Sequence, residues 1–82
     1  MTRTADVTLD CEGLLCPLPV LKARKALARM APGGLLRLTA TDRMAAIDLP
    51  HFCAEAGHRF HGSESQGDVT AYLIERGPDP AR

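Results

Sequence analysis

The chain has 82 residues, of which 45% are hydrophobic and 24% are charged, and its formal net charge at pH 7 is zero. This composition is typical of a folded soluble domain and excludes a disordered chain, while the length leaves no room for a second domain. With no Trp, one Tyr and two Phe, the core is expected to be aliphatic. We expect residues 1–82 to form a single domain, with an ordered core over about 6–76 and a flexible tail over 77–82.

Neither a targeting segment nor a membrane span is visible in the sequence. The first ten residues, MTRTADVTLD, lack the apolar region of a signal peptide, and no apolar run is long enough to cross a bilayer. The three cysteines are an odd number, unlike the paired frameworks of small secreted domains, so a reducing compartment is expected to keep them as thiols. We therefore expect a cytoplasmic protein that does not contact the membrane.

The first half of the chain predicts a strand, a helix and a second strand. Apolar and polar residues alternate in DVTLDCEG (6–13), which is the period of a half-buried strand. Apolar residues recur at helical spacing from Pro17, and APGG (31–34) ends that helix. The run LLRLTAT (35–41) predicts a strand, and this order favours a parallel pair with a right-handed crossover. The expected buried residues are Val7, Leu9, Cys11, Val20, Ala23, Leu27, Met30, Leu36, Leu38 and Ala40.

The second half predicts a short helix over DLPHFCAEAG (48–57). Asp48 is expected near its N-cap, Pro50 in its first turn and Gly57 at its C-terminal cap. The side chains expected to face inward are Phe52, Cys53 and Ala56.

Two further strands are predicted at HRFHGSES (58–65) and DVTAYLIER (68–76), joined by a turn in which Gly67 takes a positive φ. The resulting order is β-α-β-α-β-β. It predicts an α/β (α+β) two-layer sandwich, with two helices packed on one face of a four-stranded mixed sheet.

The segment LLCPLPVLKARKAL (14–27) places Cys16 against Pro17 and Pro19, where the first strand passes into the first helix. Proline favours the first helical position, which predicts Cys16 as the N-cap, although Pro19 favours a helix that begins only after Leu18. The helix dipole and nearby cations favour the thiolate, and the prolines favour an exposed, rigidly held sulfur. Those cations are Lys22, Arg24 and Lys25. Alternatively, Cys16 is a small buried hydrophobe, and the residues alone leave both interpretations open.

The remaining candidate residues have weaker patterns. Cys11 and Cys53 are predicted to be core residues; a resolving role for Cys11 is disfavoured because four residues, not two, separate it from Cys16. Neither a metal nor a cofactor is predicted, because the spacing of the nearby histidines and Cys53 matches no zinc signature. Those histidines are His51, His58 and His61. The basic helix face lacks the aromatic residues of a nucleic-acid surface, so direct nucleic-acid binding is not expected.

Two stretches resemble the TusA (SirA-like) family of small bacterial sulfur carriers. LDCEGLLCPLPVLKARKAL is similar to that family's Leu-Asp, Gly-Leu, Cys-Pro-x-Pro and lysine-bearing helix, and TDRMAAIDLPHFCAEAGH to its Thr-Asp, Asp-[Ile/Leu]-Pro, Phe-Cys and Gly-His. The resemblance extends from about Val7 to Arg76. Four residues depart from the pattern: Leu15 where a basic residue is common, Arg43 for proline, Gly34 for glutamate, and Cys11 for a residue that is usually not cysteine. Leu15 makes the surroundings of Cys16 more apolar than usual.

The resemblance implies a sulfurtransferase that needs no cofactor and carries sulfane sulfur as a persulfide on Cys16. It implies a cysteine desulfurase or a rhodanese as sulfur donor and a downstream sulfur-relay protein as acceptor, in tRNA 2-thiolation, molybdenum-cofactor supply or sulfur oxidation. Pro17 and Pro19 would shape the turn. Lys22, Arg24 and Lys25 would support the anion or dock the partner.

The competing hypothesis is a non-enzymatic interaction module or regulator that binds a protein or RNA through the basic helix face. Thiol labelling is expected to separate the two, because a carrier's Cys16 should react faster at neutral pH than an ordinary thiol. A monomer is expected in either case.

Overall fold

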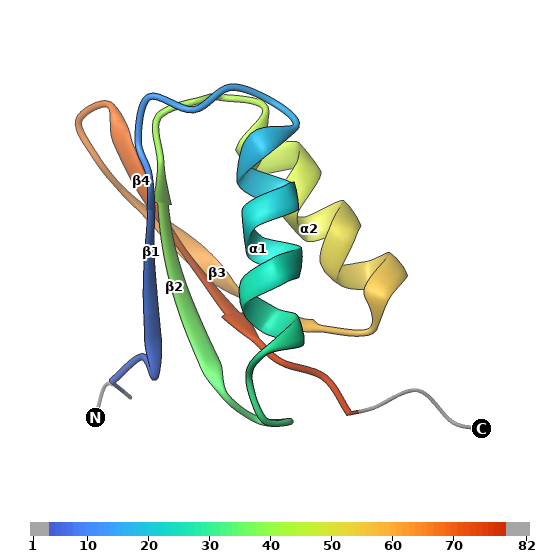
Figure 1. Cartoon of the computed structure of the whole chain (residues 1–82). Helices are drawn as coiled ribbons and strands as arrows, with labels where there is room; N and C mark the ends of the chain where they lie inside the picture. The colour runs from blue at the N-terminus through green and yellow to red at the C-terminus, as the bar shows by residue number, and fades with distance from the viewer. Residues whose placement is uncertain (1–3, 79–82) are drawn as a thin grey trace.

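The computed structural model describes residues 4–78, which form an open four-stranded sheet with two helices covering one of its faces (Figure 1). In chain order the elements are β1 (Val7–Cys11), α1 (Leu18–Ala28), β2 (Leu35–Ala40), α2 (Ala45–Ala56), β3 (Arg59–Gln66) and β4 (Val69–Glu75). The β-α-β-α-β-β order and the position of both helices on one face confirm the predicted fold class.

The sheet is mixed, with the strand order β1-β2-β4-β3. β1 pairs with β2 in parallel, so that Cys11 lies opposite Ala40, and β4 pairs antiparallel with both β2 and β3. Because parallel neighbours end at the same edge of a sheet, the loops that follow β1 and β2 leave side by side, at the top of Figure 1. Residues 12–17 and 41–44 thereby meet, although they are far apart in the sequence.

The core lies between the sheet and the two helices. The predicted buried residues of β2, Leu36, Leu38 and Ala40, are confirmed. The strand does not alternate strictly, because Leu35 and Thr39 of the opposite phase are buried too. The helices and the remaining strands complete the core with Cys11, Ala23, Leu27, Ala45, Leu49, Phe52, Cys53, Tyr72 and Ile74, against which Val7, Leu9, Val20 and Met30 are partly buried. The prediction that Ala56 faces inward is wrong: it occupies the last position of α2, where the chain turns through the exposed Gly57.

α2 begins three residues earlier than the sequence pattern predicts, at Ala45 instead of Asp48. The helix begins at Ala45 with Met44 as its N-cap, so Asp48 lies one turn inside the helix and Pro50 lies within it. The prediction rested on the preference of proline for the first helical turn. The earlier start is supported by backbone bonds, since the N–H of Ala45 donates to the carbonyl of Asp42 (3.1 Å) and that of Asp48 to Met44 (2.8 Å).

The predicted ends and turns of the second half are confirmed. Gly57 caps α2 with a φ of +82°, and Gly67 has a φ of +63° in the turn between β3 and β4, two conformations that favour glycine. The predicted tail begins with Gly77, which is buried and donates its N–H to Nδ1 of His58 (2.9 Å). Residues 79–82 lie outside the described part of the chain.

His58 is expected to make stability fall in acid. Burial and the positive charge of Arg76 lower the pKa of His58, and its neutral Nδ1 accepts the Gly77 bond. Because the pKa of His58 is lower in the folded chain than in the unfolded chain, neutral His58 stabilises the fold. This contribution to stability is complete above the ordinary pKa of 6.5 and is lost as the pH falls through and below that value. Urea unfolding between pH 8 and 5 should therefore show a declining free energy of unfolding.

Two histidine variants test the origin of that decline. His58→Asn should be less stable than the parent at pH 8 and should flatten the pH dependence, because the titrating ring is gone. His51→Asn is the control, since the His51 side chain is exposed on α2 and should leave the pH dependence unchanged. An unchanged slope in His58→Asn would assign the acid sensitivity to other groups.

Candidate functional site

The site is built where the β1–α1 loop meets the β2–α2 loop. The N–H of Gly13 donates to Oγ1 of Thr41 (2.9 Å), and the N–H of Cys16 donates to Oδ2 of Asp42 (2.7 Å). The second carboxylate oxygen of Asp42 accepts a bond from the N–H of Met44 (3.2 Å). Asp42 thus holds the loop that carries Cys16 against the start of α2.

Cys16 lies one residue before the cap of α1. The N-cap is Pro17, whose carbonyl accepts the N–H of Leu21 (3.1 Å). The prediction that Cys16 is the N-cap is therefore wrong, because a turn between Leu15 and Leu18 precedes the helix. α1 begins at Leu18 itself, so the alternative of a start only after Leu18 is also wrong. The predicted exposure of the Cys16 side chain is confirmed.

The sulfur of Cys16 is held by an acid from the other helix. Sγ donates a hydrogen bond to Oδ2 of Asp48 (2.9 Å). This bond raises the pKa of the Cys16 thiol, and desolvation and the negative charges of Asp48 and Asp42 raise it further. The expectation that Cys16 favours the thiolate is wrong for the chain by itself, because the carboxylates beside the sulfur favour the protonated thiol. A carrier's Cys16 would then label no faster than an ordinary thiol, so labelling rate does not separate the two hypotheses.

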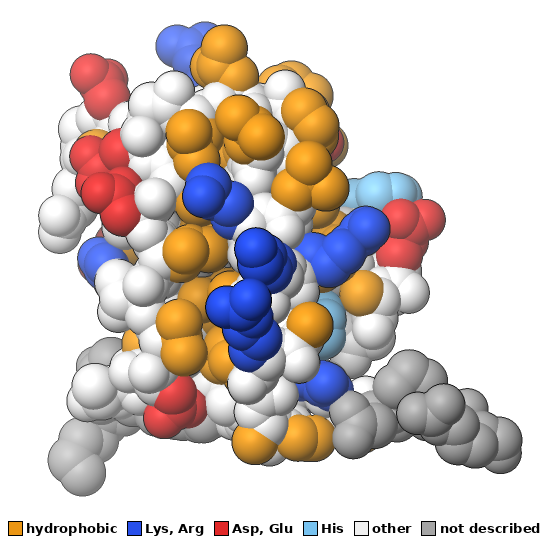
Figure 2. Space-filling view, in the orientation of Figure 1, with side chains coloured by type: hydrophobic (Ala, Val, Ile, Leu, Met, Phe, Trp, Pro, Cys, Tyr) orange, Lys and Arg blue, Asp and Glu red, His pale blue; other side chains and the backbone are white. Residues whose placement is uncertain are grey.

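The three predicted cations are not equally placed. Arg24 faces the Cys16 side of α1, where its guanidinium lies over the ring of Phe52 at 5.5 Å. Lys22 and Lys25 instead border a different hollow of α1, together with Leu9, Ala26 and Arg29. In Figure 2 basic side chains run along this exposed face of α1. The structure therefore brings one predicted cation, Arg24, to the site, and the charge of Lys22 acts instead on Cys11.

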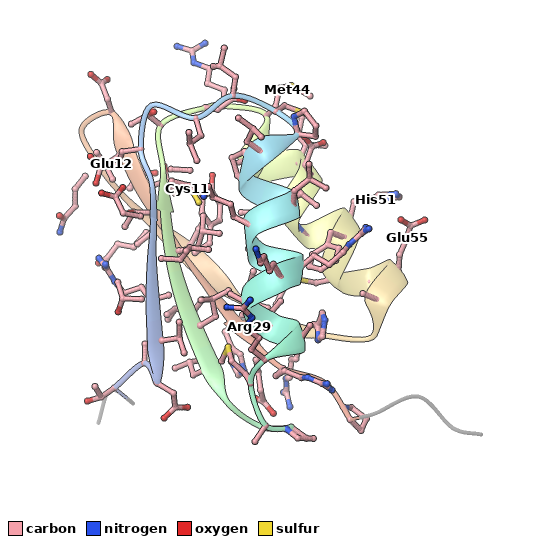
Figure 3. The ribbon with its side chains drawn as sticks, viewed as in Figure 1. Cys11, Glu12, Arg29, Met44, His51 and Glu55 are labelled. Carbon is pink, nitrogen blue, oxygen red and sulfur yellow. The ribbon has the colours of Figure 1, made fainter. Side chains whose placement is uncertain are left out.

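A shallow hollow with a volume of about 270 Å³ opens beside Cys16, between α1 and α2. Pro17, Val20 and Arg24 border it from the α1 side, whereas Pro19 is buried. From α2 it is bordered by Asp48, His51, Phe52 and Glu55. Nε2 of His51 lies 3.4 Å from Oε1 of Glu55, and both side chains point outward from α2 (Figure 3). The hollow leaves the sulfur and the Asp48 carboxylate open to an incoming group.

Exposed apolar side chains surround the Cys16 loop. Among the described residues, the large hydrophobic side chains that are exposed all lie on this loop or at the first turns of the two helices. They form what we call the apolar rim, which consists of Leu15, Leu18, Leu21, Met44 and Ile47. Leu15 and Ile47 are the most exposed, at 69% and 64%. Figure 2 shows apolar side chains gathered over this end of α1, as expected for a surface that contacts another protein.

Apart from His51, the other cysteines and histidines considered in the sequence do not border the hollow. Cys11 and Cys53 are free and buried, as predicted, and burial raises the pKa of Cys53 to about 11. Figure 3 shows Cys11 between the sheet and α1. His61 bonds to Oε1 of Glu75 through Nε2 at 2.8 Å, which links β3 to β4. Within residues 4–78, no three His, Cys, Asp or Glu side chains are grouped so that they could hold a metal ion.

Asp42 and Asp48 are site residues that the sequence pattern did not predict. Asp48 was read only as a helix cap, and nothing in the local pattern shows that its carboxylate reaches a sulfur 32 positions away in the chain. The available signal was the TDRMAAIDLP stretch, whose two acids belong to the pattern that resembles the TusA family. The apolar rim was missed as well, except for Leu15.

Comparisons with known proteins show relatives that match along most of this chain. The family described as sulfurtransferase TusA matches residues 7–76. A sulfur carrier protein TusA from Pseudomonas aeruginosa is 37% identical over 79 residues, covering 96% of this chain and all of the relative. A putative sulfur carrier protein from Neisseria meningitidis is 43% identical over 68 residues, covering 83% of this chain and 92% of the relative.

A solved structure shows the same fold. The crystal structure of a SirA-like protein from Desulfitobacterium hafniense superposes with a TM-score of 0.77 at 28% identity, covering 87% of this chain and 97% of that one. Among the described residues, neither helix is long and apolar enough to cross a membrane. The match along residues 7–76 and the full-length relative show that this chain belongs to the TusA family and is a sulfur carrier.

Proposed function

We propose that the chain carries sulfane sulfur as a persulfide on Cys16 and relays it between proteins. The observation that carries the proposal is that Cys16 is the exposed cysteine, held at the meeting of two loops and surrounded by the apolar rim, whereas Cys11 and Cys53 are buried. A cysteine desulfurase or a rhodanese supplies the sulfur. A downstream relay protein receives it, for tRNA 2-thiolation, molybdenum-cofactor supply or sulfur oxidation.

The surroundings of Cys16 suit a hand-off between two protein surfaces. A transferred sulfur must be reached by a donor cysteine and later by an acceptor cysteine, so the thiol has to stand at an open surface. Pro17 shapes the turn that presents it, and the buried Pro19 anchors the first turn of α1. The apolar rim supplies the surface that a partner covers. Arg24 borders the hollow beside Cys16.

The proposed loading step needs no oxidant. Cys16 attacks the outer sulfur of a donor persulfide; a bond forms between Sγ and that sulfur, and the bond between the donor's two sulfurs breaks. The electron pair of the broken bond goes to the donor's inner sulfur, which ends as a thiol with the proton that Cys16 has lost. Release to an acceptor thiol repeats the exchange, with Cys16 as the leaving group.

Mass spectrometry tests this function directly. The protein is incubated with a cysteine desulfurase and cysteine, or with a rhodanese and thiosulfate, and its intact mass is measured before and after a reductant is added. We expect a gain of one sulfur that the reductant removes and that peptide mapping assigns to Cys16. If neither donor adds sulfur to the folded protein, the persulfide proposal fails.

A further inference from the structure

The bond between Cys16 and Asp48 joins the loop before α1 to α2, beside the hollow between the two helices. Sγ lies 2.9 Å from Oδ2 of Asp48, and the backbone N–H of Cys16 is held by Asp42 at 2.7 Å. Cys16 is therefore held twice by carboxylates from outside its own loop: Asp42 holds its backbone and Asp48 holds its sulfur. Asp48 is half-buried and borders the hollow, so a group that enters there reaches both the carboxylate and the sulfur.

The negative charge at this place is not balanced within the described part of the chain. The charged and titratable groups that border the hollow besides Cys16 are Arg24 from α1 and Asp48, His51 and Glu55 from α2. Asp42, from the loop before α2, lies next to Cys16 through its bond to the backbone N–H. Arg24 lies over Phe52, and His51 pairs with Glu55. No ion pair to Asp48 or Asp42 is formed between residues 4–78. An acidic centre inside an apolar rim is the complement of a partner that brings a basic group to its reacting sulfur.

We propose that Asp48 is a positioning residue that retains the proton on Cys16 in the free chain, and that partners release it with a basic side chain beside their reactive sulfur. The inference rests on the proposed function, because it describes how the same thiol is prepared for transfer. A cation that pairs with Asp48 removes the acceptor of the S–H bond and offsets the negative charge next to the sulfur. The thiol then loses its proton to the medium, and the thiolate attacks the partner's sulfur.

This arrangement would also limit side reactions. A thiolate exposed on the free protein would react with oxidants and alkylating compounds, whereas a protonated thiol reacts slowly. Reactivity would rise only in the encounter with a basic partner. Asp48 would therefore favour sulfur exchange with proteins that carry a basic group beside their reactive sulfur over proteins that lack one. The sulfur atom of Cys16 itself stays exposed.

The first test measures how fast Cys16 reacts with iodoacetamide between pH 6 and 10. Removing the charge in Asp48→Asn should shift the alkylation profile to lower pH and speed alkylation at pH 7.5 by about three- to tenfold. Glu55→Gln is the matched control, since it removes a carboxylate from the same hollow without touching the sulfur, and its rate should stay within about twofold of the parent. Circular dichroism verifies that each variant is folded, and Asp48→Ala provides a second removal of the acceptor.

The second test probes the charge of the partner with small disulfides. Cystamine carries two ammonium groups, and bis(2-hydroxyethyl) disulfide is neutral but undergoes the same thiol exchange. The parent protein should prefer cystamine, and both Asp48 variants should lose most of that preference, whereas Glu55→Gln should keep it. A mere structural role of Asp48 would change both rates by the same factor.

The outcomes separate this inference from the proposed function. If Cys16 accepts sulfur but neither Asp48 variant changes the alkylation profile, the inference is overturned and the carrier proposal stands. If the alkylation profile shifts but the preference for cystamine is unchanged, the basic-partner part is overturned. If the parent protein accepts no sulfur from either enzymatic donor, the carrier proposal fails whatever the alkylation shows.

Discussion

Cys16→Ser is expected to abolish sulfur loading and to leave the stability of the fold unchanged. Serine cannot form a persulfide, and the two other thiols are buried beneath the helices. The substitution itself is mild, because Cys16 is exposed and a serine hydroxyl can donate to Asp48 as the thiol does. The free energy of unfolding should stay within about 0.5 kcal/mol of the parent. Intact mass after incubation with donor measures the loading, and urea unfolding measures the stability.

Cys53→Ala is the matched control for that result. It removes a thiol from the same helix that carries Asp48, but one that lies 1% exposed in the core. Its folded fraction should load sulfur as the parent does, although stability should fall. Cys11→Ser should likewise change the loading little. A mass gain of one sulfur in folded Cys16→Ser would move the carrier site to another residue.

The fold could be predicted because its main elements are encoded locally. The alternation of Val7, Leu9 and Cys11 predicts β1. Gly57 marks the end of α2 and Gly67 marks the turn between β3 and β4, and both glycines adopt a positive φ. Such signals depend on a few neighbouring residues, so a single sequence contains them. The start of α2 was harder to place, because a proline that usually begins a helix lies here inside one.

The electrostatics of the site could not be predicted in the same way. The sequence places Lys22, Arg24 and Lys25 close to Cys16 and places Asp48 far from it, which suggests a cationic site. The fold reverses this order: Asp48 from α2 contacts the sulfur, while Lys22 and Lys25 border a different hollow. The pKa of a thiol depends on distances between side chains, and those distances follow from the packing of α1 against α2.

Two neighbouring residues of α2 should separate the stability of the fold from the contact with partners. Leu49 is fully buried beneath the helix, and truncating a buried leucine leaves a cavity that costs about 2–5 kcal/mol. For a domain of 82 residues this is a large part of the total stability, which is about 0.05–0.15 kcal/mol per residue. Leu49→Ala should therefore lower the midpoint of urea unfolding strongly. It should also loosen the helix that positions Asp48.

Ile47→Ala, on the apolar rim, should leave stability almost unchanged and should weaken the contact with partners. Ile47 is 64% exposed, so its truncation should change stability by no more than about 0.5 kcal/mol. If the rim contacts a partner, the same truncation should lower kcat/KM for loading from a protein donor by about fivefold or more, the effect of losing one apolar contact in an interface. Loading from a small persulfide should be unaffected, because such a donor does not cover the rim. Equal loading of Ile47→Ala and the parent by both donors would show that the partner docks elsewhere, whereas equal losses would indicate damage to the thiol site itself.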